Sequence, residues 1–267
     1  HTGTLDPQAK GVLPICLGHA TKVTDILTEN SKTYQVTGLL GIVTDTQDLD
    51  GRIIEKNKVM VEKDQLTSII QSFIGDYEQL PPMYSAIKVN GKKLYELARE
   101  GQIIERKKRQ VRINDIKILD INLNTNEFTM IVDCSKGTYI RTLIHDIGQK
   151  LGCGASMKDL LRTRVGIFDI NQSLRLDEIE EMAKKDGIDS ILIKVDQLFP
   201  DYEKVILLEE HSKLLYNGNS FTSQQIKNFN SLMKLEKVLL YDWKGQFTAI
   251  YQYHEEKKIF KPFKMFL

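Results

Sequence analysis

The chain has 267 residues, of which 41% are hydrophobic and 27% are charged, with a formal net charge of +1. This composition is ordinary for a globular protein, and the length allows one large domain or a medium domain followed by a small one. No run of about 18 apolar residues and no charged-then-apolar leader is present, so neither a membrane-spanning helix nor a secretory signal is expected. The three cysteines are scattered, which argues against a disulfide framework or a zinc site and favours a reducing cytoplasm.

A basic stretch is hidden by the near-zero net charge. Between residues 88 and 112, basic side chains outnumber the opposing Glu96, Glu100 and Glu105. The basic residues are Lys88, Lys92, Lys93, Arg99, Arg106, Lys107, Lys108, Arg109 and Arg112. Such a stretch fits a phosphate-binding patch or an ordinary solvated face, and composition alone leaves both interpretations open.

The first elements in chain order mix irregular and regular structure. Residues 3–18 are rich in Gly and Pro with apolar residues between them, which predicts a buried irregular segment. The alternation in residues 32–42 predicts a strand, and residues 45–51 predict a turn. Apolar residues at helical spacing over 66–73 predict a helix that ends at Gly75.

The middle of the chain predicts a hairpin, a short helix and two paired strands. Asn90-Gly91 is a strong hairpin turn, and residues 93–100 predict a short helix. Residues 111–118 predict a strand with an irregularity near Asp115, and the alternation over 127–134 predicts a strand that pairs with it.

The last part predicts two helices and then a β-rich tail. Thr138 is the expected cap of a helix that ends at Gly152, and a second helix covers residues 177–185. Leu198-Phe199-Pro200 marks a domain boundary. The tail strands are expected over 204–208, 235–242 and 247–253. Helices and strands mix without βαβ regularity, which favours an α+β fold.

Asp6 is the first residue suited to chemistry. Proline at position 7 disfavours the α region for Asp6, and Gly3 and Gly11 allow tight backbone paths around it. The segment can therefore present a carboxylate on a rigid loop. From these residues alone an Asx turn, in which the carboxylate bonds its own backbone, is the favoured interpretation, because Asp-Pro is a common turn pair.

Tyr84 stands beside the basic stretch. An aromatic side chain next to lysines is the pattern used to stack a base while neutralising phosphates. A core tyrosine beside an exposed hairpin gives the same pattern.

Arg141 falls in the first turn of the predicted helix after Thr138. A cation there is disfavoured by the helix dipole, which suggests an anionic partner, either a carboxylate or a phosphate. A surface arginine without a special role is the alternative.

Four segments together resemble a known family. HTGTLDPQAKGVLPICLG is similar to the signature loop of the TruB family of tRNA pseudouridine synthases. KTYQVTGLLGIVTDTQDLDG, PPMYSAIKVNGKKLYELAREG and CSKGTYIRTLIHDIGQKLGCGA resemble further segments of that family, in the same order. The resemblance runs from His1 to about Gly166 and is looser beyond.

The resemblance implies a role for individual residues. Asp6 matches the catalytic aspartate, and Arg141 the arginine that pairs with it. Tyr84 matches the tyrosine that stacks on the target base, Tyr139 an aromatic residue of the same pocket, and Leu160 an apolar wall residue.

Further matches concern substrate holding. His1 matches a histidine that helps to hold the flipped-out nucleotide, and Lys32 with Tyr34 matches a Lys-x-Tyr strand expected to support the cleft. The residues expected at the RNA backbone are Lys88, Lys92 and Lys93.

The resemblance also implies the fold and the domains. It predicts a pseudouridine synthase fold, with a mixed, mostly antiparallel sheet flanked by helices and a central cleft. Residues 1–200 are the expected catalytic domain, and 201–267 a PUA-like RNA-binding domain that contacts the elbow of tRNA. A stabilising β-extension is the alternative for the tail. Family members carry a few dozen residues before the first segment, so fraying is expected around Asp6.

The implied activity is isomerisation of uridine 55 in the tRNA T loop by a cytoplasmic monomer. The reaction involves neither redox change nor hydrolysis, so no metal and no cofactor are expected. The T stem-loop of tRNA is the expected partner, reached by base flipping. The alternative is an RNA chaperone that binds tRNA in the same cleft without turnover. A guide-RNA-dependent relative acting on ribosomal RNA is disfavoured because long basic extensions are absent.

Overall fold

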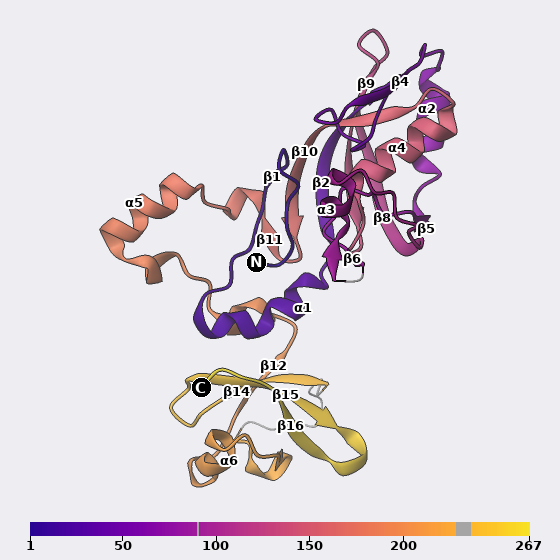
Figure 1. The fold of residues 1–267 in the computed structure, drawn as a ribbon. Helices are drawn as coiled ribbons and strands as arrows, with labels where there is room; N and C mark the ends of the chain where they lie inside the picture. The colour runs from indigo at the N-terminus through magenta and orange to yellow at the C-terminus, as the bar shows by residue number, and fades with distance from the viewer. Residues whose placement is uncertain (90, 228–235) are drawn as a thin grey trace. The chain divides into compact units, whose positions relative to one another are not determined.

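The computed structural model describes residues 1–89, 91–227 and 236–267 (Figure 1). It divides into two compact units, called here the large-sheet unit and the small-sheet unit. The large-sheet unit consists of Gly3–Pro14 and Leu27–Ser173. The small-sheet unit consists of His1–Thr2, Ile15–Ile26 and Leu174–Leu267. The expected catalytic domain over 1–200 and PUA-like domain over 201–267 stay predictions.

A seven-stranded sheet forms the centre of the large-sheet unit. Its order is β1-β10-β2-β9-β8-β5, with β11 paired to β10. The strands are β1 (Lys10–Gly11), β2 (Lys32–Leu40), β5 (Gly75–Gln79), β8 (Arg109–Asn122), β9 (Glu127–Cys134), β10 (Ala155–Val165) and β11 (Phe168–Asp169). Only the β1–β10 pair of this sheet is parallel, so the sheet is mostly antiparallel, as predicted.

Helices and two small hairpins complete this unit. The helices are α2 (Lys63–Gln71), α3 (Leu94–Arg99), α4 (Ile140–Leu151) and the 3-10 helix η2 (Ile170–Gln172), while α1 (Thr24–Thr28) lies across the division between the units. The hairpins are β3 (Ile42–Thr44) with β4 (Ile53–Lys56), and β6 (Lys88–Val89) with β7 (Lys92–Lys93). The turn between β6 and β7 was predicted at Asn90-Gly91, and Asn90 lies outside the described residues.

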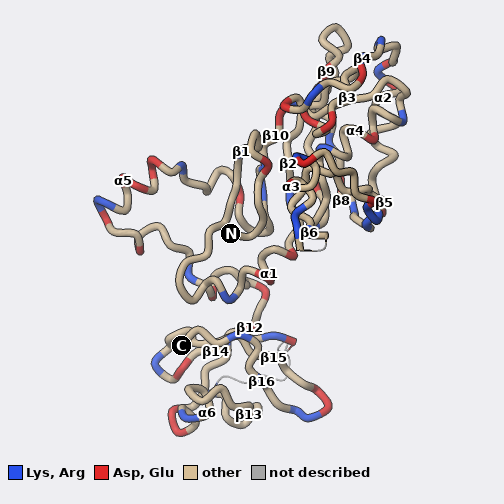
Figure 2. The backbone as a smooth tube through the Cα atoms, viewed as in Figure 1, with Lys and Arg blue, Asp and Glu red and all other residues tan. Residues whose placement is uncertain are grey.

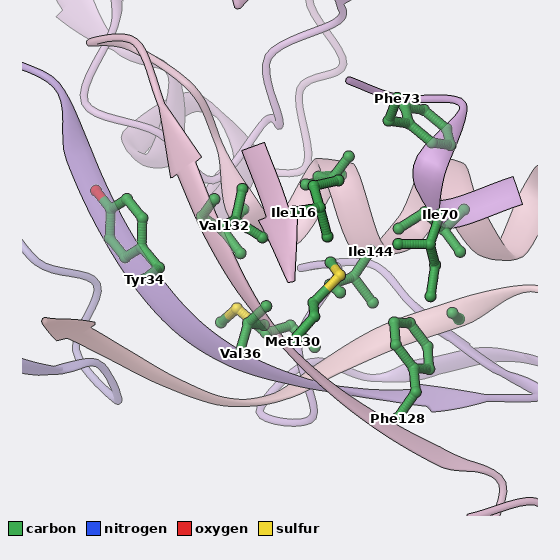
Figure 3. Close-up of a cluster of buried hydrophobic side chains, with 14 of the residues drawn as sticks. Tyr34, Val36, Ile70, Phe73, Ile116, Phe128, Met130, Val132 and Ile144 are labelled. Atoms are coloured by element: carbon green, nitrogen blue, oxygen red, sulfur yellow. The ribbon is translucent and has the colours of Figure 1, made fainter. Parts of the chain in front are cut away.

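The core lies between the sheet and helices α2 and α4. In β9 every second residue is buried, and Phe128, Met130 and Val132 pack against Ile70 of α2 and Ile144 of α4 (Figure 3). Each such side chain contributes roughly 1.5–3 kcal/mol by leaving water. This packing fixes where α4 begins relative to the strands.

Several predicted elements are confirmed. The helix that was expected to end at Gly75 ends at Gln71, and Gly75 instead begins β5. Two further details are wrong. The irregularity expected near Asp115 is a register shift between Ile113 and Asp115, where β8 pairs with β9. Gly152 ends α4 in the left-handed conformation, at φ 75°. Thr138 is not the cap of α4, because its hydroxyl donates to Ser135 O and the N-cap is Tyr139.

The second error concerns the segment after Asp6. Val12 is buried, but Leu13, Ile15 and Leu17 are exposed. Because β1 is only two residues long at the sheet edge, the chain that follows it runs along the surface. The segment is therefore buried at Val12 rather than throughout.

A five-stranded sheet forms the small-sheet unit. Its order is β12-β14-β15-β16-β13, with strands β12 (Glu203–Ile206), β13 (Phe221–Thr222), β14 (Lys237–Tyr241), β15 (Phe247–His254) and β16 (Ile259–Met265). Its helices are α5 (Leu176–Asp186), α6 (Ser212–Tyr216), η1 (Gly18–Val23), η3 (Ile188–Ile191), η4 (Val195–Leu198), η5 (Glu209–His211), η6 (Ser223–Gln225) and η7 (Glu255–Lys257). The β-rich tail and the helix over 177–185 are thus confirmed. Residue 235, the start of one predicted strand, lies outside the described residues.

The early segment Ile15–Ile26 is tied to the small sheet. Lys22 Nζ donates to Met265 O at 2.8 Å, and Lys264 forms an ion pair with Asp25 at 2.8 Å. The core of this sheet includes Val205, Leu240 and Tyr251. None of the described helices is long and apolar enough to cross a membrane.

Candidate active site

Asp6 lies on a short loop that returns to the large sheet through β1. Asp6 O accepts a hydrogen bond from Ala9 N at 2.9 Å, which closes a tight turn at the Asp6-Pro7 pair. Three residues further on, Val12 N donates to Arg162 O of β10 at 2.9 Å. The carboxylate of Asp6 is 34% exposed, so it is partly withdrawn from water.

Arg141 meets this carboxylate from the first turn of α4. Its Nη2 donates to Asp6 Oδ1 at 3.0 Å, and its Nε lies 2.8 Å from Asp6 Oδ2. The Arg141 side chain is only 5% exposed. The predicted pairing of the two residues is therefore present, as one hydrogen bond through Nη2 and one close ion-pair contact at Nε, which together fix the direction of the carboxylate.

Three further oxygens hold the Arg141 guanidinium. Nη2 donates to Tyr84 O at 2.8 Å, and Nη1 donates to Thr46 O at 3.0 Å. Nη1 also lies 3.4 Å from Asp48 Oδ2, and the Asp48 side chain is 14% exposed. The guanidinium is thus shared by two carboxylates and anchored by two carbonyls.

Asp48 was not predicted as a site residue. Its stretch, from Asp45 to Gly51, was interpreted only as a turn. Two features could have identified Asp48: the resemblance of this stretch to a family segment, and the requirement of a buried Arg141 for a counter-charge.

Burial sets the charge balance at Asp6. It raises the pKa of the Asp6 carboxyl, and the nearby charge of Asp48 raises it further, while Arg141 lowers it by its charge and its hydrogen bond. The net direction is upward. Arg141 thus acts in the expected sense, but burial has the larger effect on this pKa.

Tyr139, at the start of α4, is held by the buried Gln79 of β5. Tyr139 N donates to Gln79 Oε1 at 2.7 Å, and Gln79 Nε2 donates to Tyr139 O at 2.9 Å. Gln79 is 1% exposed. Burial raises the pKa of the Tyr139 hydroxyl, and the charge of Asp6 adds to this rise, which places the phenol within electrostatic reach of that carboxylate.

The other two tyrosines differ in how they approach the site. Tyr84 is half-buried and contacts Arg141 through its carbonyl. Tyr34 of β2 is 8% exposed, and burial raises its pKa to about 12, with Arg162 and Asp6 both influencing the hydroxyl. Tyr34 is therefore electrostatically coupled to the Asp6 loop.

Leu160 and His1 occupy contrasting positions. Leu160 lies in β10 opposite Val36, is 9% exposed and belongs to the large core. His1 is exposed and groups with the small-sheet unit.

The three lysines expected at the RNA backbone lie in the β6–β7 hairpin. Lys88 and Lys92 are exposed, and Lys92 Nζ lies 3.7 Å from Glu100 Oε2. Lys93 is half-buried, with its Nζ 5.4 Å from the centre of the Tyr95 ring. Figure 2 shows basic residues around β5 and β6.

No potential metal site is found among residues 1–89, 91–227 and 236–267. Within these ranges, no three His, Cys, Asp or Glu side chains gather in a way that could hold an ion.

Comparisons with known proteins cover the whole chain. Residues 1–140 match the family model of the TruB family pseudouridylate synthase N-terminal domain, and residues 141–204 match that of the tRNA pseudouridylate synthase B C-terminal domain. The chain is 46% identical to tRNA pseudouridine synthase B of Lachnoclostridium phytofermentans, over 100% of this chain and 90% of that protein. It is 42% identical to that of Staphylococcus saprophyticus, over 100% and 89%.

Solved structures share the fold at lower identity. A Cbf5-Nop10-Gar1 complex matches with a TM-score of 0.71 and 24% identity, over 100% of this chain and 76% of that chain. An H/ACA RNP bound to a substrate RNA containing 2'-deoxyuridine matches with a TM-score of 0.70 and 22% identity, over 99% and 75%.

The mixed sheet, the helices on it and these matches define the fold of a pseudouridine synthase. The predicted fold class is confirmed. More specifically, this chain belongs to the TruB family of tRNA pseudouridine synthases, isomerases that convert uridine in tRNA to pseudouridine.

Proposed function

We propose that this protein isomerises uridine 55 in the T loop of tRNA, with the carboxylate of Asp6 as the catalytic group. The observation that carries the proposal is the two-point contact of Asp6 with Arg141, a guanidinium only 5% exposed. A carboxylate withdrawn from water and held in one direction suits attack on a substrate atom.

The reaction exchanges one bond for another. The bond from uracil N1 to ribose C1′ breaks, the base turns, and a bond from C5 to C1′ forms. The C5 proton leaves and N1 gains a proton, so no oxidant, reductant or water is consumed. A carboxylate serves this exchange as a nucleophile or by stabilising oxocarbenium character at the sugar.

Arg141 keeps Asp6 available for that step. It lowers the pKa of a carboxyl that burial alone would raise further. Asp48, Thr46 O and Tyr84 O anchor the guanidinium, so it meets Asp6 in one orientation. Arg141 is thus proposed to position the catalytic group, and Asp48 to position Arg141.

The proposed base-holding residues are those that match the family's substrate pocket. Tyr84 stacks on the uracil, Tyr139 lines the same pocket and Leu160 forms its apolar wall, while His1 contacts the flipped nucleotide. Stacking on an aromatic ring contributes roughly 1–3 kcal/mol per base.

Lysines and the tail are proposed to bind the rest of the tRNA. The exposed Lys88 and Lys92, with Lys93, neutralise backbone phosphates of the T stem-loop. Residues 201–267 act as a PUA-like RNA-binding domain. The protein is proposed to act as a monomer in the cytoplasm.

Asp6→Asn tests the assignment. The variant keeps the shape of the side chain but removes its charge, so we expect tRNA binding within a few-fold of the unchanged protein and no product. Tritium release from tRNA carrying 5-tritiated uridine measures C5 exchange, and mapping of pseudouridine locates the product.

The control for this experiment is the unchanged protein with tRNA whose uridine 55 is replaced by cytidine. Normal turnover by Asp6→Asn would overturn the role of Asp6. Product at another uridine would overturn the position. Binding and refolding of tRNA without tritium release by the unchanged protein would favour the chaperone function.

A further inference from the structure

Arg162 is a fully buried arginine on the large sheet, separate from the Arg141 pair. It lies in β10, and its residue exposure is 1%. Its Nε donates to Val12 O at 2.7 Å, and its Nη2 donates to Gly3 O at 3.1 Å. Gly3 and Val12 stand at the two ends of the loop that carries Asp6.

The main chain of Arg162 contacts the same loop. Its carbonyl accepts Val12 N at 2.9 Å, and Gly11 pairs with Arg162 in the parallel β1–β10 contact. A Cβ atom at Gly11 would lie 2.1 Å from Arg162 O. The loop is therefore seated directly on the backbone of Arg162 and tied at both ends by its side chain.

The acceptors of this guanidinium are unusual for a buried cation. Among residues 1–89, 91–227 and 236–267 it makes no ion pair, and the Arg162 side-chain bonds described above end on carbonyl oxygens. Arg162 also interacts with the Tyr34 hydroxyl and is within electrostatic reach of another cation, Lys32, whose pKa is lowered by burial and by Arg162. Burying a cation without a counter-charge is unfavourable, so packing alone is a poor account of this residue.

We propose that Arg162 is a positioning residue for the isomerisation: its side chain holds the main chain of the Asp6 loop at both ends. This rests on the proposed role of Asp6. Arg141 holds the carboxylate of Asp6, and Arg162 holds the backbone on either side of it. The two arginines approach from different elements, α4 and β10, and together leave Asp6 one position.

The expected consequence is a loss of rate without a loss of binding. A misplacement of about 1 Å in a catalytic group is enough to reduce a rate about 100-fold. The contacts of Arg162 are to the protein's own carbonyls, so its replacement removes no group that faces the tRNA.

Arg162→Lys and Arg164→Lys form a matched pair for the test. Arg164 lies on the same strand, is half-buried and is also bonded to a carbonyl, donating through Nη1 to Gly166 O at 2.9 Å. It forms an ion pair with Asp133, and its other side-chain hydrogen bonds go to Thr33 and Ser31, outside the Asp6 loop. Each lysine keeps the charge and loses the planar fork that bonds two acceptors.

The measurements are single-turnover tritium release, tRNA affinity, Tm and hydrogen exchange of the Val12 amide. For Arg162→Lys we expect a rate about 10- to 100-fold lower, affinity within about threefold and faster exchange at Val12. For Arg164→Lys we expect a comparable fall in Tm with a nearly unchanged rate. Arg162→Gln, measured in the same way, replaces Arg162→Lys if the lysine variant does not fold.

The outcomes separate this inference from the proposed function. A normal rate in Arg162→Lys, or equal rate losses in both variants that follow Tm, would overturn the positioning role. A loss of affinity equal to the loss of rate would also overturn it. Asp6→Asn is measured alongside: if that variant is active, the role of Asp6 fails first, and if it is inactive, a normal rate in Arg162→Lys counts against Arg162 alone.

Discussion

Asp6 is subject to opposing electrostatic influences from different parts of the fold. Burial raises its pKa, the guanidinium of Arg141 on α4 lowers it, and the carboxylate of Asp48 raises it. Tyr34 on β2 and Tyr139 before α4 also lie within electrostatic reach of Asp6. A carboxylate with a raised pKa is a stronger base and nucleophile than an exposed aspartate, provided that it is still ionised.

The pH dependence of the rate should report this balance. If ionised Asp6 is required, the rate falls as pH drops through its pKa, and because that pKa is raised, the fall begins at higher pH than for an exposed aspartate. Asp48→Asn removes a neighbouring negative charge and should move this acid limb to lower pH. Single-turnover tritium release across a pH series measures the limb.

Asp50→Asn is a suitable control for that series. Asp50 is exposed on the same turn and is not among the groups that shift the pKa of Asp6. Its replacement should leave the acid limb in place. An acid limb that is the same in all three proteins would show that Asp48 does not influence the titrating group, or that this group is not Asp6.

Among the elements, those with regular alternation were predictable from the sequence. Strand β9 has one buried face, and α4 buries Ile140, Leu143, Ile144 and Ile147 at helical spacing, so each carries its own periodic signal. The pairing of Asp6 with Arg141 followed from the resemblance and from the unfavourable place of a cation at a helix start.

Strand β10 was missed for a physical reason. Its pairing with β2 shifts register between Met157 and Asp159, and again between Arg162 and Arg164. Each shift moves the following side chains to the other face, which removes the period of two that identifies a strand. Arg162 is buried, so one of the inward-facing positions of this strand is occupied by a charged residue, which further weakens the apolar pattern expected of a strand. Because strand β10 was not predicted, the contacts of Arg162 with the Asp6 loop were not predicted either.

Gly11 tests how closely β1 must approach β10. Gly11 and Gly75 share φ 110°, a conformation that strains any residue with a Cβ. At Gly11 the added Cβ would lie 2.1 Å from Arg162 O, whereas at Gly75 nothing lies within 4 Å. Gly11→Ala should therefore lower the rate of tritium release at least about tenfold by displacing the Asp6 loop.

Gly75→Ala is the matched control, because it introduces the same backbone strain without the clash. Both variants should lose stability, by about 1–3 kcal/mol for the strained conformation, as measured by denaturant unfolding. Only Gly11→Ala should lose rate beyond what its stability explains. Equal rates in the two variants would mean that the loop tolerates separation from β10.

Over the whole molecule, the net charge of +1 conceals an uneven distribution. Lys107 and Lys108 are exposed near the start of β8, close in sequence to the hairpin that carries Lys92 and Lys93. In the small-sheet unit, α5 is rich in acidic residues, with Lys184 and Lys185 among them (Figure 2). Only the first group is placed to favour a polyanion, because the carboxylates around the second repel phosphate.

Binding of tRNA should therefore respond to salt through the first group and not through the second. Each phosphate neutralised by a lysine releases counterions and adds about 0.7–0.9 to the slope of log affinity against log salt. Replacing Lys92, Lys93, Lys107 and Lys108 by Gln should weaken binding and flatten that slope by up to about 3.6. Replacing Lys184 and Lys185 by Gln is the control, since Lys184 is paired with Glu180 at 2.6 Å and is surrounded by acids. The measurement is tRNA affinity over a salt series. An unchanged slope in the fourfold variant would show that the tRNA backbone is bound elsewhere on the molecule. An equal change of slope in the control would show the same.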